Sequence, residues 1–178
     1  MLLEKAMKAL EKADALDDLL EQLDRPLDVV FEFQLSDDVA REYIAKAREA
    51  LARRFFAAAV NGELKALEEL LAHDVVLHGD GGGKAPALAH PVHGRAKVAR
   101  TLLAWFRAAA RIGGVTLRSA EVNGQPGALL LDPEGRLVTV LAVDVADGQV
   151  QAIRSIVNPD KLRHLGPTAN LGELPAGD

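Results

Sequence analysis

The feature that most constrains this fold is a series of four short apolar segments that fill the second half of the chain. They are rich in Val, Leu and Ile, as strands are, and they cover residues 115–122, 128–131, 137–145 and 150–157. Turn-forming residues separate them, at 123–126, 132–135 and 146–149. Such short intervals favour hairpins. The sequence therefore predicts an antiparallel sheet, which needs a cover over at least one face.

The first half of the chain supplies that cover as helices. Apolar residues at intervals of three and four predict helices over 37–60, 63–72 and 95–112. A short strand is expected at 74–80 and an edge strand near 90–93. Helices that precede a run of strands indicate an α+β fold. We expect a curved antiparallel sheet wrapped on the helices as a cone, with a pocket at its open end.

Composition excludes several classes of protein. The 178 residues suit one domain, and a hydrophobic content of 49% is enough for a core. The absence of cysteine rules out disulfides, thiolate zinc sites and a cysteine nucleophile. A net charge of −5 argues against direct nucleic-acid binding. No apolar run approaches about 18 residues and no signal peptide is visible, so we expect a cytoplasmic protein without a membrane segment.

The acidic excess is confined to an N-terminal arm. Residues 1–35 hold four Lys or Arg and nine Asp or Glu, which accounts for the whole net charge of −5. An amphipathic helix with a leucine stripe is predicted over 2–23, followed by a stop at Pro26 and a short strand. The shift in charge indicates a segment of different origin or role from the rest, either native to the chain or a foreign or engineered addition. Its leucine face predicts a homodimer. A folded domain over 36–166 and a flexible tail over 167–178 complete the chain.

A glycine-rich loop carries the most informative motif. Its three glycines permit positive φ angles and a close approach of the backbone to a ligand or partner. It lacks the spacing and the ending of a phosphate-binding Walker A loop. The candidate ligand-binding residues are Asp80, Gly81, Gly82, Gly83, Lys84 and Trp105. Trp105 and its neighbour Phe106 belong either to the core or to the wall of an apolar pocket.

A second set of candidates is chemical. His78 and Asp80 share one face of the strand predicted at 74–80. If that face looks into the cone, Asp80 is a candidate general base and His78 its partner. We expect no metal site, because His90 and His93 point in opposite directions in an extended chain.

One further pair of charges lies within apolar strands. Asp144 and Arg154 belong to consecutive predicted strands. Charges buried in such strands need partners. We expect them to pair with each other in a structural role, or alternatively to polarise a ligand in the pocket.

Several segments together resemble one known family. They read DVVLHGDGGGKAPAL at 74–88, PVHGRAKVARTLL at 91–103, AEVNGQPGALLL at 120–131 and AIRSIVNPDKLRHL at 152–165. They resemble the C-terminal SnoaL-like domain, of NTF2-like fold, of extracytoplasmic-function sigma factors of the SigJ type. The DGGGK and NPDKL motifs carry most of the specificity, and the resemblance covers about residues 48–165. It implies the cone-shaped α+β fold expected above.

The resemblance also implies a function in transcription regulation. Such a domain would dock on the sigma factor core or on RNA polymerase, and a small apolar ligand in the cone would modulate it. The resemblance assigns the docking role to the glycine loop and to Asn158, Pro159, Asp160, Lys161 and Leu162. The first 47 residues are acidic and show no helix-turn-helix, so we expect no direct contact with a promoter.

Two alternatives remain beside this regulatory hypothesis. The first is a small-molecule isomerase or hydrolase that uses Asp80 and His78. No complete triad, metal site or cofactor motif supports it, so we favour a protein that is not an enzyme and expect no cofactor. The second alternative is an engineered scaffold on the same fold, because a fold alone does not define an activity.

Overall fold

The computed structural model describes residues 37–169. The helix and strand predicted within residues 1–35, and the dimer predicted from that leucine face, lie outside the described residues. Among the described helices, none is long and apolar enough to cross a membrane.

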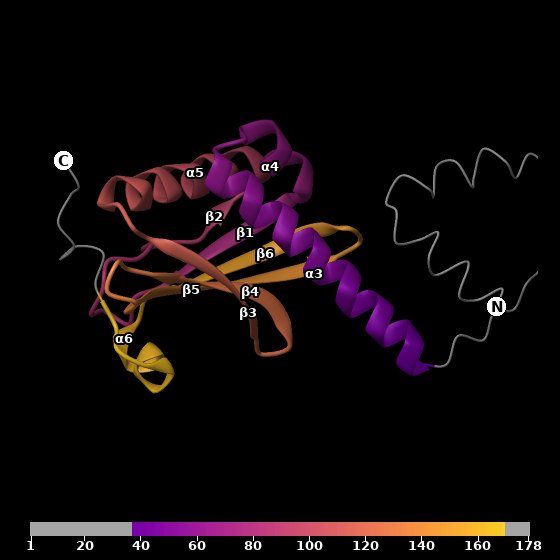
Figure 1. The fold of residues 1–178 in the computed structure, drawn as a ribbon. Helices are drawn as coiled ribbons and strands as arrows, with labels where there is room; N and C mark the ends of the chain where they lie inside the picture. Colours follow the sequence, from indigo (N-terminus) through magenta and orange to yellow (C-terminus); the bar gives the residue numbers. More distant parts are fainter. Residues whose placement is uncertain (1–36, 170–178) are drawn as a thin grey trace, which may run out of the picture. The chain divides into compact units, whose positions relative to one another are not determined.

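The described chain folds into helices followed by a strand-rich half, in the predicted order (Figure 1). The elements are α3 (Asp37–Asn61), α4 (Leu64–Leu70), β1 (Leu71–Asp80), β2 (Val92–His93), α5 (Arg95–Ile112), β3 (Thr116–Val122), β4 (Gln125–Leu131), β5 (Leu137–Ala146), β6 (Gln149–Ile156), α6 (Pro159–Leu162) and the 3-10 turn Arg163–Leu165. The bounds of α5 are those predicted. The helix predicted over 63–72 is shorter, because Leu71 already belongs to β1.

Two-residue turns set the hairpins. Asn123 and Gly124 both have positive φ, at 53° and 74°, as do Asp147 and Gly148, at 52° and 67°. Such turns match the twist of the strands that they join. The first turn lets β4 begin at Gln125, three residues earlier than predicted.

The sheet has the order β2-β1-β6-β5-β4-β3. All neighbouring pairs are antiparallel except β1 and β6, which run parallel with Gly79 opposite Ser155. The antiparallel pairing that we predicted is therefore wrong for this one pair and correct for the others. Hairpin turns fix the direction only of consecutive strands, whereas β1 and β6 are separated by α5 and four further strands.

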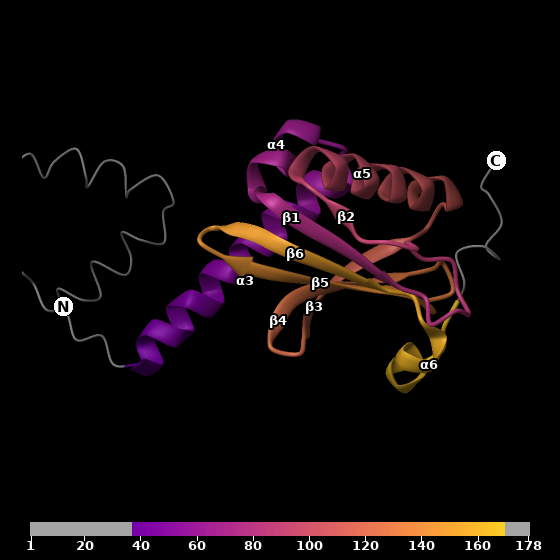
Figure 2. The same cartoon turned by 180° about the vertical axis from the view of Figure 1, so that it is seen from behind.

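The helices cover one face of the sheet (Figures 1 and 2). Phe55 of α3, Leu67 of α4 and Leu102 of α5 are completely buried there. They pack in one cluster with Leu77 of β1 and Ile153 of β6. Burying such side chains stabilises the fold by about 1.5–3 kcal/mol each.

A smaller cluster anchors α6 to the end of the sheet. Leu162 of α6 is buried against Leu137 and Val140 of β5. Residues 167–169 run beside the start of β5, because Leu137 N donates to Pro167 O at 2.8 Å and Ala169 N donates to Leu137 O at 2.9 Å. This beginning of the predicted flexible tail therefore belongs to the folded domain. The remainder of the tail lies outside the described residues.

The packing of α3 yields a stability prediction. Replacing Phe55, which is 0% exposed, by Ala should lower the free energy of unfolding by about 3–5 kcal/mol. Val60 on the same helix is 56% exposed, and its replacement by Ala should change stability by no more than about 0.5 kcal/mol. Urea denaturation of both variants measures the difference. Equal effects would contradict the core described above.

Candidate functional site

The glycine motif folds into a tight loop directly after β1. Gly82 N donates to the carboxylate of Asp80 at 3.1 Å. Lys84 N and Ala85 N donate to Gly81 O at 3.0 and 3.1 Å. Gly82 and Gly83 have φ of +58° and +70°, the left-handed region that glycine tolerates best.

The NPDKL motif forms the short helix α6. Asn158 is its N-cap, and its side-chain oxygen accepts from Asp160 N at 3.1 Å. Pro159 occupies the first helical turn, where its missing N–H is not needed. The segment after β6 is therefore a short helix, with Leu162 as its anchor in the small cluster.

The structure brings these two motifs together. Lys161 Nζ lies 2.7 Å from the carboxylate of Asp80, and Lys84 Nζ lies 2.6 Å from that of Asp160. We call these four residues the ion-pair latch. Asn158 lies against the loop as well, because a methyl group on Gly82 would overlap its side chain. Each motif thus supplies one acid and one base to a reciprocal contact.

The latch lowers the pKa of both of its acids. The hydrogen bond from Lys161 is the main cause for Asp80 and outweighs a partial loss of hydration. The hydrogen bond from Lys84 lowers the pKa of Asp160 in the same way. Both carboxylates are therefore ionised, and their pairs formed, throughout the neutral range.

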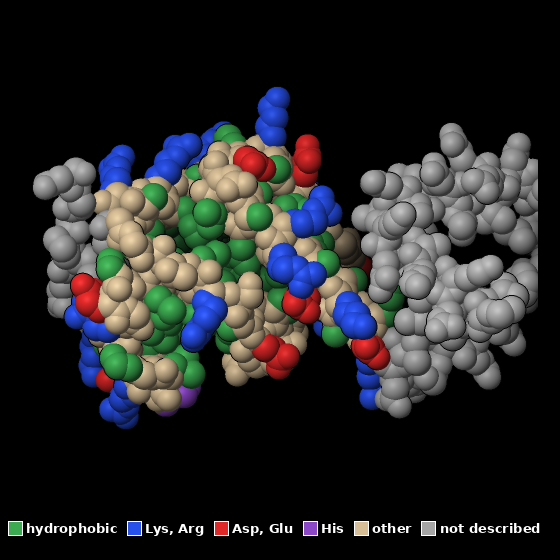
Figure 3. All heavy atoms as spheres, viewed as in Figure 1, with side chains coloured by type: hydrophobic (Ala, Val, Ile, Leu, Met, Phe, Trp, Pro, Cys, Tyr) green, Lys and Arg blue, Asp and Glu red, His purple; other side chains and the backbone are tan. Residues whose placement is uncertain are grey.

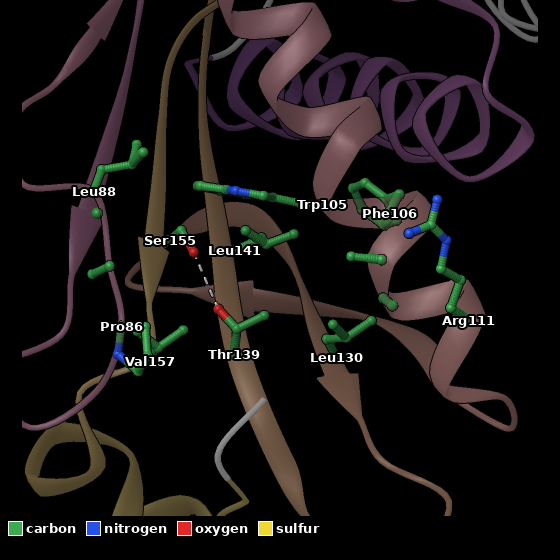
Figure 4. A pocket seen from close by; sticks show the side chains of 14 residues that line it. Pro86, Leu88, Trp105, Phe106, Arg111, Leu130, Thr139, Leu141, Ser155 and Val157 are labelled. Atoms are coloured by element: carbon green, nitrogen blue, oxygen red, sulfur yellow. Dashed lines mark hydrogen bonds between the residues drawn. The ribbon is translucent and has the colours of Figure 1, made fainter. Parts of the chain in front are cut away.

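An apolar cavity of about 530 Å³ lies beside the latch, between α5 and the sheet. Its walls come from α5, from β1, β4, β5 and β6, and from the loop after the glycine motif. The lining residues are Gly79, Pro86, Ala87, Leu88, Trp105, Phe106, Ala108, Ala109, Arg111, Leu130, Thr139, Leu141, Ser155 and Val157 (Figure 4). Volume and apolar lining are those of small-molecule sites in proteins. Trp105 and Phe106 thus serve both the core and the pocket wall.

The catalytic alternative needs the face of β1 that carries His78 and Asp80 to line the cavity. The cavity lies against the other face. Gly79 lines the cavity, and Val75 and Leu77 are buried on the same face. His78 is exposed on the other face, and Asp80 belongs to the latch. Neither His78, Asp80 nor the glycine motif lines the cavity, so of the candidate ligand-binding residues only Trp105 does.

Sequence reasoning missed two hydroxyl groups in the cavity. Thr139 of β5 and Ser155 of β6 are buried, and their hydroxyl oxygens lie 3.3 Å apart. For Thr139 the signal was present, because it is a polar residue within the apolar start of β5, whereas Ser155 lies in a strand that also carries two glutamines and an arginine. Only the strand register shows that both side chains enter the same cavity.

The remaining predicted residues lie at the surface. Arg154 Nη1 donates to the Asp144 carboxylate at 2.6 Å, which confirms the expected pair, although both side chains are substantially exposed. His90 and His93 are exposed. Within residues 37–169 no group of three or more His, Cys, Asp or Glu could hold a metal ion.

Comparison with known proteins identifies the family. Residues 52–159 match the SnoaL-like domain, so the chain belongs to that family and the predicted α+β fold is confirmed. The sigma factor SigJ of Mycobacterium tuberculosis is 34% identical over 122 residues, which are 65% of this chain and 39% of SigJ. A crystal structure of SigJ matches with 33% identity and a TM-score of 0.53, covering 72% of this chain and 48% of that one. The chain therefore spans less than half the length of these relatives.

A more distant solved structure is an NTF2-like protein from Mesorhizobium loti. It is 19% identical, with a TM-score of 0.47, and the match covers 64% of this chain and 93% of that one.

Neighbouring glycines provide a matched test of the loop. A Cβ at Gly82 would overlap Asn158, whereas Gly83 has open space around it, and both have positive φ. Gly82→Ala should therefore destabilise the domain by about 1–3 kcal/mol more than Gly83→Ala. Denaturant unfolding measures stability, and hydrogen exchange at the Leu162 amide reports on α6. Equal stability and equal hydrogen exchange in the two variants would mean that the loop does not pack against α6.

The lowered acid pKa values predict how the latch responds to pH. Its stabilisation is complete above the unfolded-state pKa, about 3.9 for Asp, and is lost as the pH falls through the lower folded-state pKa. Lys161→Met should raise the pKa of Asp80 towards its ordinary value and leave Asp160 unchanged. Lys84→Met should raise the pKa of Asp160 and leave that of Asp80 unchanged. Carboxyl NMR titration of both variants tests this, and a shift of the wrong acid would contradict the pairing.

Proposed function

We propose that this SnoaL-like domain is a regulatory module of a sigma factor, which acts by docking and senses a small apolar ligand. The observation that carries the proposal is the arrangement of the two motifs by which the sequence resembles SigJ-type sigma factors. They form one surface, held by the ion-pair latch, at the rim of an apolar cavity.

The latch offers a suitable docking surface. Its Lys84, Asp160 and Lys161 side chains are 58%, 51% and 65% exposed. Exposed ion pairs contribute little to stability, yet charges fixed in position give a partner orientation and specificity. The relationship to SigJ supports the sigma factor core or RNA polymerase as that partner.

Two chain segments support a connection between the cavity and the docking surface. Lys84 belongs to the latch, and Pro86, Ala87 and Leu88 just after it line the cavity. Val157 lines the cavity and immediately precedes Asn158, the N-cap of α6. A ligand in the cavity would contact both chain segments that form the docking surface, and differential contact is what a ligand needs to shift a conformational equilibrium.

The geometry favours this role over acid–base catalysis. A general base works best with a pKa near the operating pH, whereas the latch lowers that of Asp80. Arg111 is the only charged residue that lines the cavity within the described part of the chain.

A charge swap tests the docking function. We expect the full chain to bind the promoter-binding regions of a SigJ-type sigma factor, or RNA polymerase core enzyme, in biolayer interferometry. Lys84→Asp should weaken binding at least fivefold. The double variant Lys84→Asp with Asp160→Lys restores an opposite-charge pair at the same place, but presents reversed charges to the partner.

The double variant separates stability from recognition. It should unfold like the original chain and still bind weakly, because the partner reads the polarity of the surface. Arg54→Asp on the exposed side of α3 is the control for a general change of charge. Docking that the swap leaves unchanged, or no binding to either partner, would overturn the proposal.

A further inference from the structure

The two hydroxyl groups of the cavity need no hydrogen-bond acceptor from a ligand. Thr139 Oγ1 donates to Ile156 O at 3.0 Å, which uses its one proton. Its oxygen then accepts the proton of Ser155 Oγ at 3.3 Å. Both hydroxyl protons are placed within the protein, so an apolar group can lie on this wall without leaving a donor unpaired. Figure 4 shows this hydrogen bond joining two strands, below Trp105 in the view.

Arg111 is the one charged group in the cavity lining of the described chain, and it is an exposed residue whose guanidinium has no partner. Within residues 37–169 no hydrogen bond or ion pair engages its side chain. In Figure 4 it lies on the other side of the cavity from the hydroxyl pair, beyond Phe106 and Leu130. Its guanidinium is charged at any physiological pH and binds carboxylates well, because its N–H groups match two carboxylate oxygens.

The rest of α5 strengthens the preference for an anion. This helix carries five basic residues and no acidic residue. Basic side chains stand along its outer side in Figure 3. No carboxylate lines the cavity, so within the described chain nothing there repels an anionic ligand or neutralises Arg111.

We propose that the cavity binds an apolar molecule that carries a single carboxylate, with the carboxylate at Arg111 and the apolar body against Trp105, Phe106 and Leu141. A cavity of about 530 Å³ accommodates a medium-length alkyl chain or an aromatic acid. The inference rests on the ligand-sensing part of the proposed function and names the chemical class that is sensed.

Ligand binding can be measured through the fluorescence of Trp105. It is the only tryptophan of the chain and lines the cavity, so its fluorescence reports directly on occupancy. The probes are decanoate and decanol, which share an alkyl chain and differ in charge at pH 7.5. We expect saturable fluorescence changes with both, and a dissociation constant about fivefold lower for decanoate at low salt. Added NaCl should reduce that preference.

Two variants of α5 assign the preference to one residue. Arg111→Gln should abolish the advantage of decanoate and leave decanol binding unchanged. Arg107→Gln is the matched control, because Arg107 is exposed on the same helix, as Arg111 is, but does not line the cavity. A cation in the last helical turn also favours the helix itself, so unfolding midpoints of both variants are compared, and isothermal titration calorimetry verifies the affinities.

The outcomes separate this inference from the proposed function. Equal affinity for the two probes, equal effects of the two variants, or no saturable binding would overturn the carboxylate ligand. The docking experiment contains no ligand, so its failure would refute the regulatory role while a decanoate preference that depends on Arg111 would still support this site.

Discussion

The parallel pairing of β1 with β6 is the constraint on which the rest of the domain depends. Two parallel strands end at the same edge of a sheet. Gly79 lies opposite Ser155, and Asp80 opposite Ile156, so the glycine loop and α6 leave the sheet side by side. The latch is possible only because of this register. An antiparallel pairing would send the two motifs to opposite ends of the sheet.

The cavity follows from the way α5 crosses that sheet. The first half of the helix fills the core through Val98 and Leu102, whereas the second half spans the cavity with Trp105 and Phe106. Gly79 lies in the opposite wall, and a methyl group there would overlap the backbone of Leu88. The missing side chain at Gly79 therefore leaves space for the cavity, and Trp105 and Phe106 form its opposite wall. That space borders the loop whose other end belongs to the latch.

Much of the fold was predictable, because amphipathic periods and turn residues act locally. The bounds of α5 and the Asn-Gly and Asp-Gly hairpins are of this kind. The candidate site was predictable only in part. The DGGGK and NPDKL motifs stand out in the sequence, but their contact spans 76 to 81 residues. Which face of β1 meets the cavity is a question of packing, and the alternation of residues cannot answer it.

The sequence by itself determined the elements, the apolar residues of the core and the two motifs, because each depends on short-range chemistry. Only the tertiary structure decided that Asp80 pairs with Lys161 rather than serving a pocket, and that Thr139, Ser155 and Arg111 share a cavity. The physical reason is strand pairing. A one-residue change of register moves every side chain to the other face of the sheet, and register between strands distant in sequence is fixed by the packing of the whole domain.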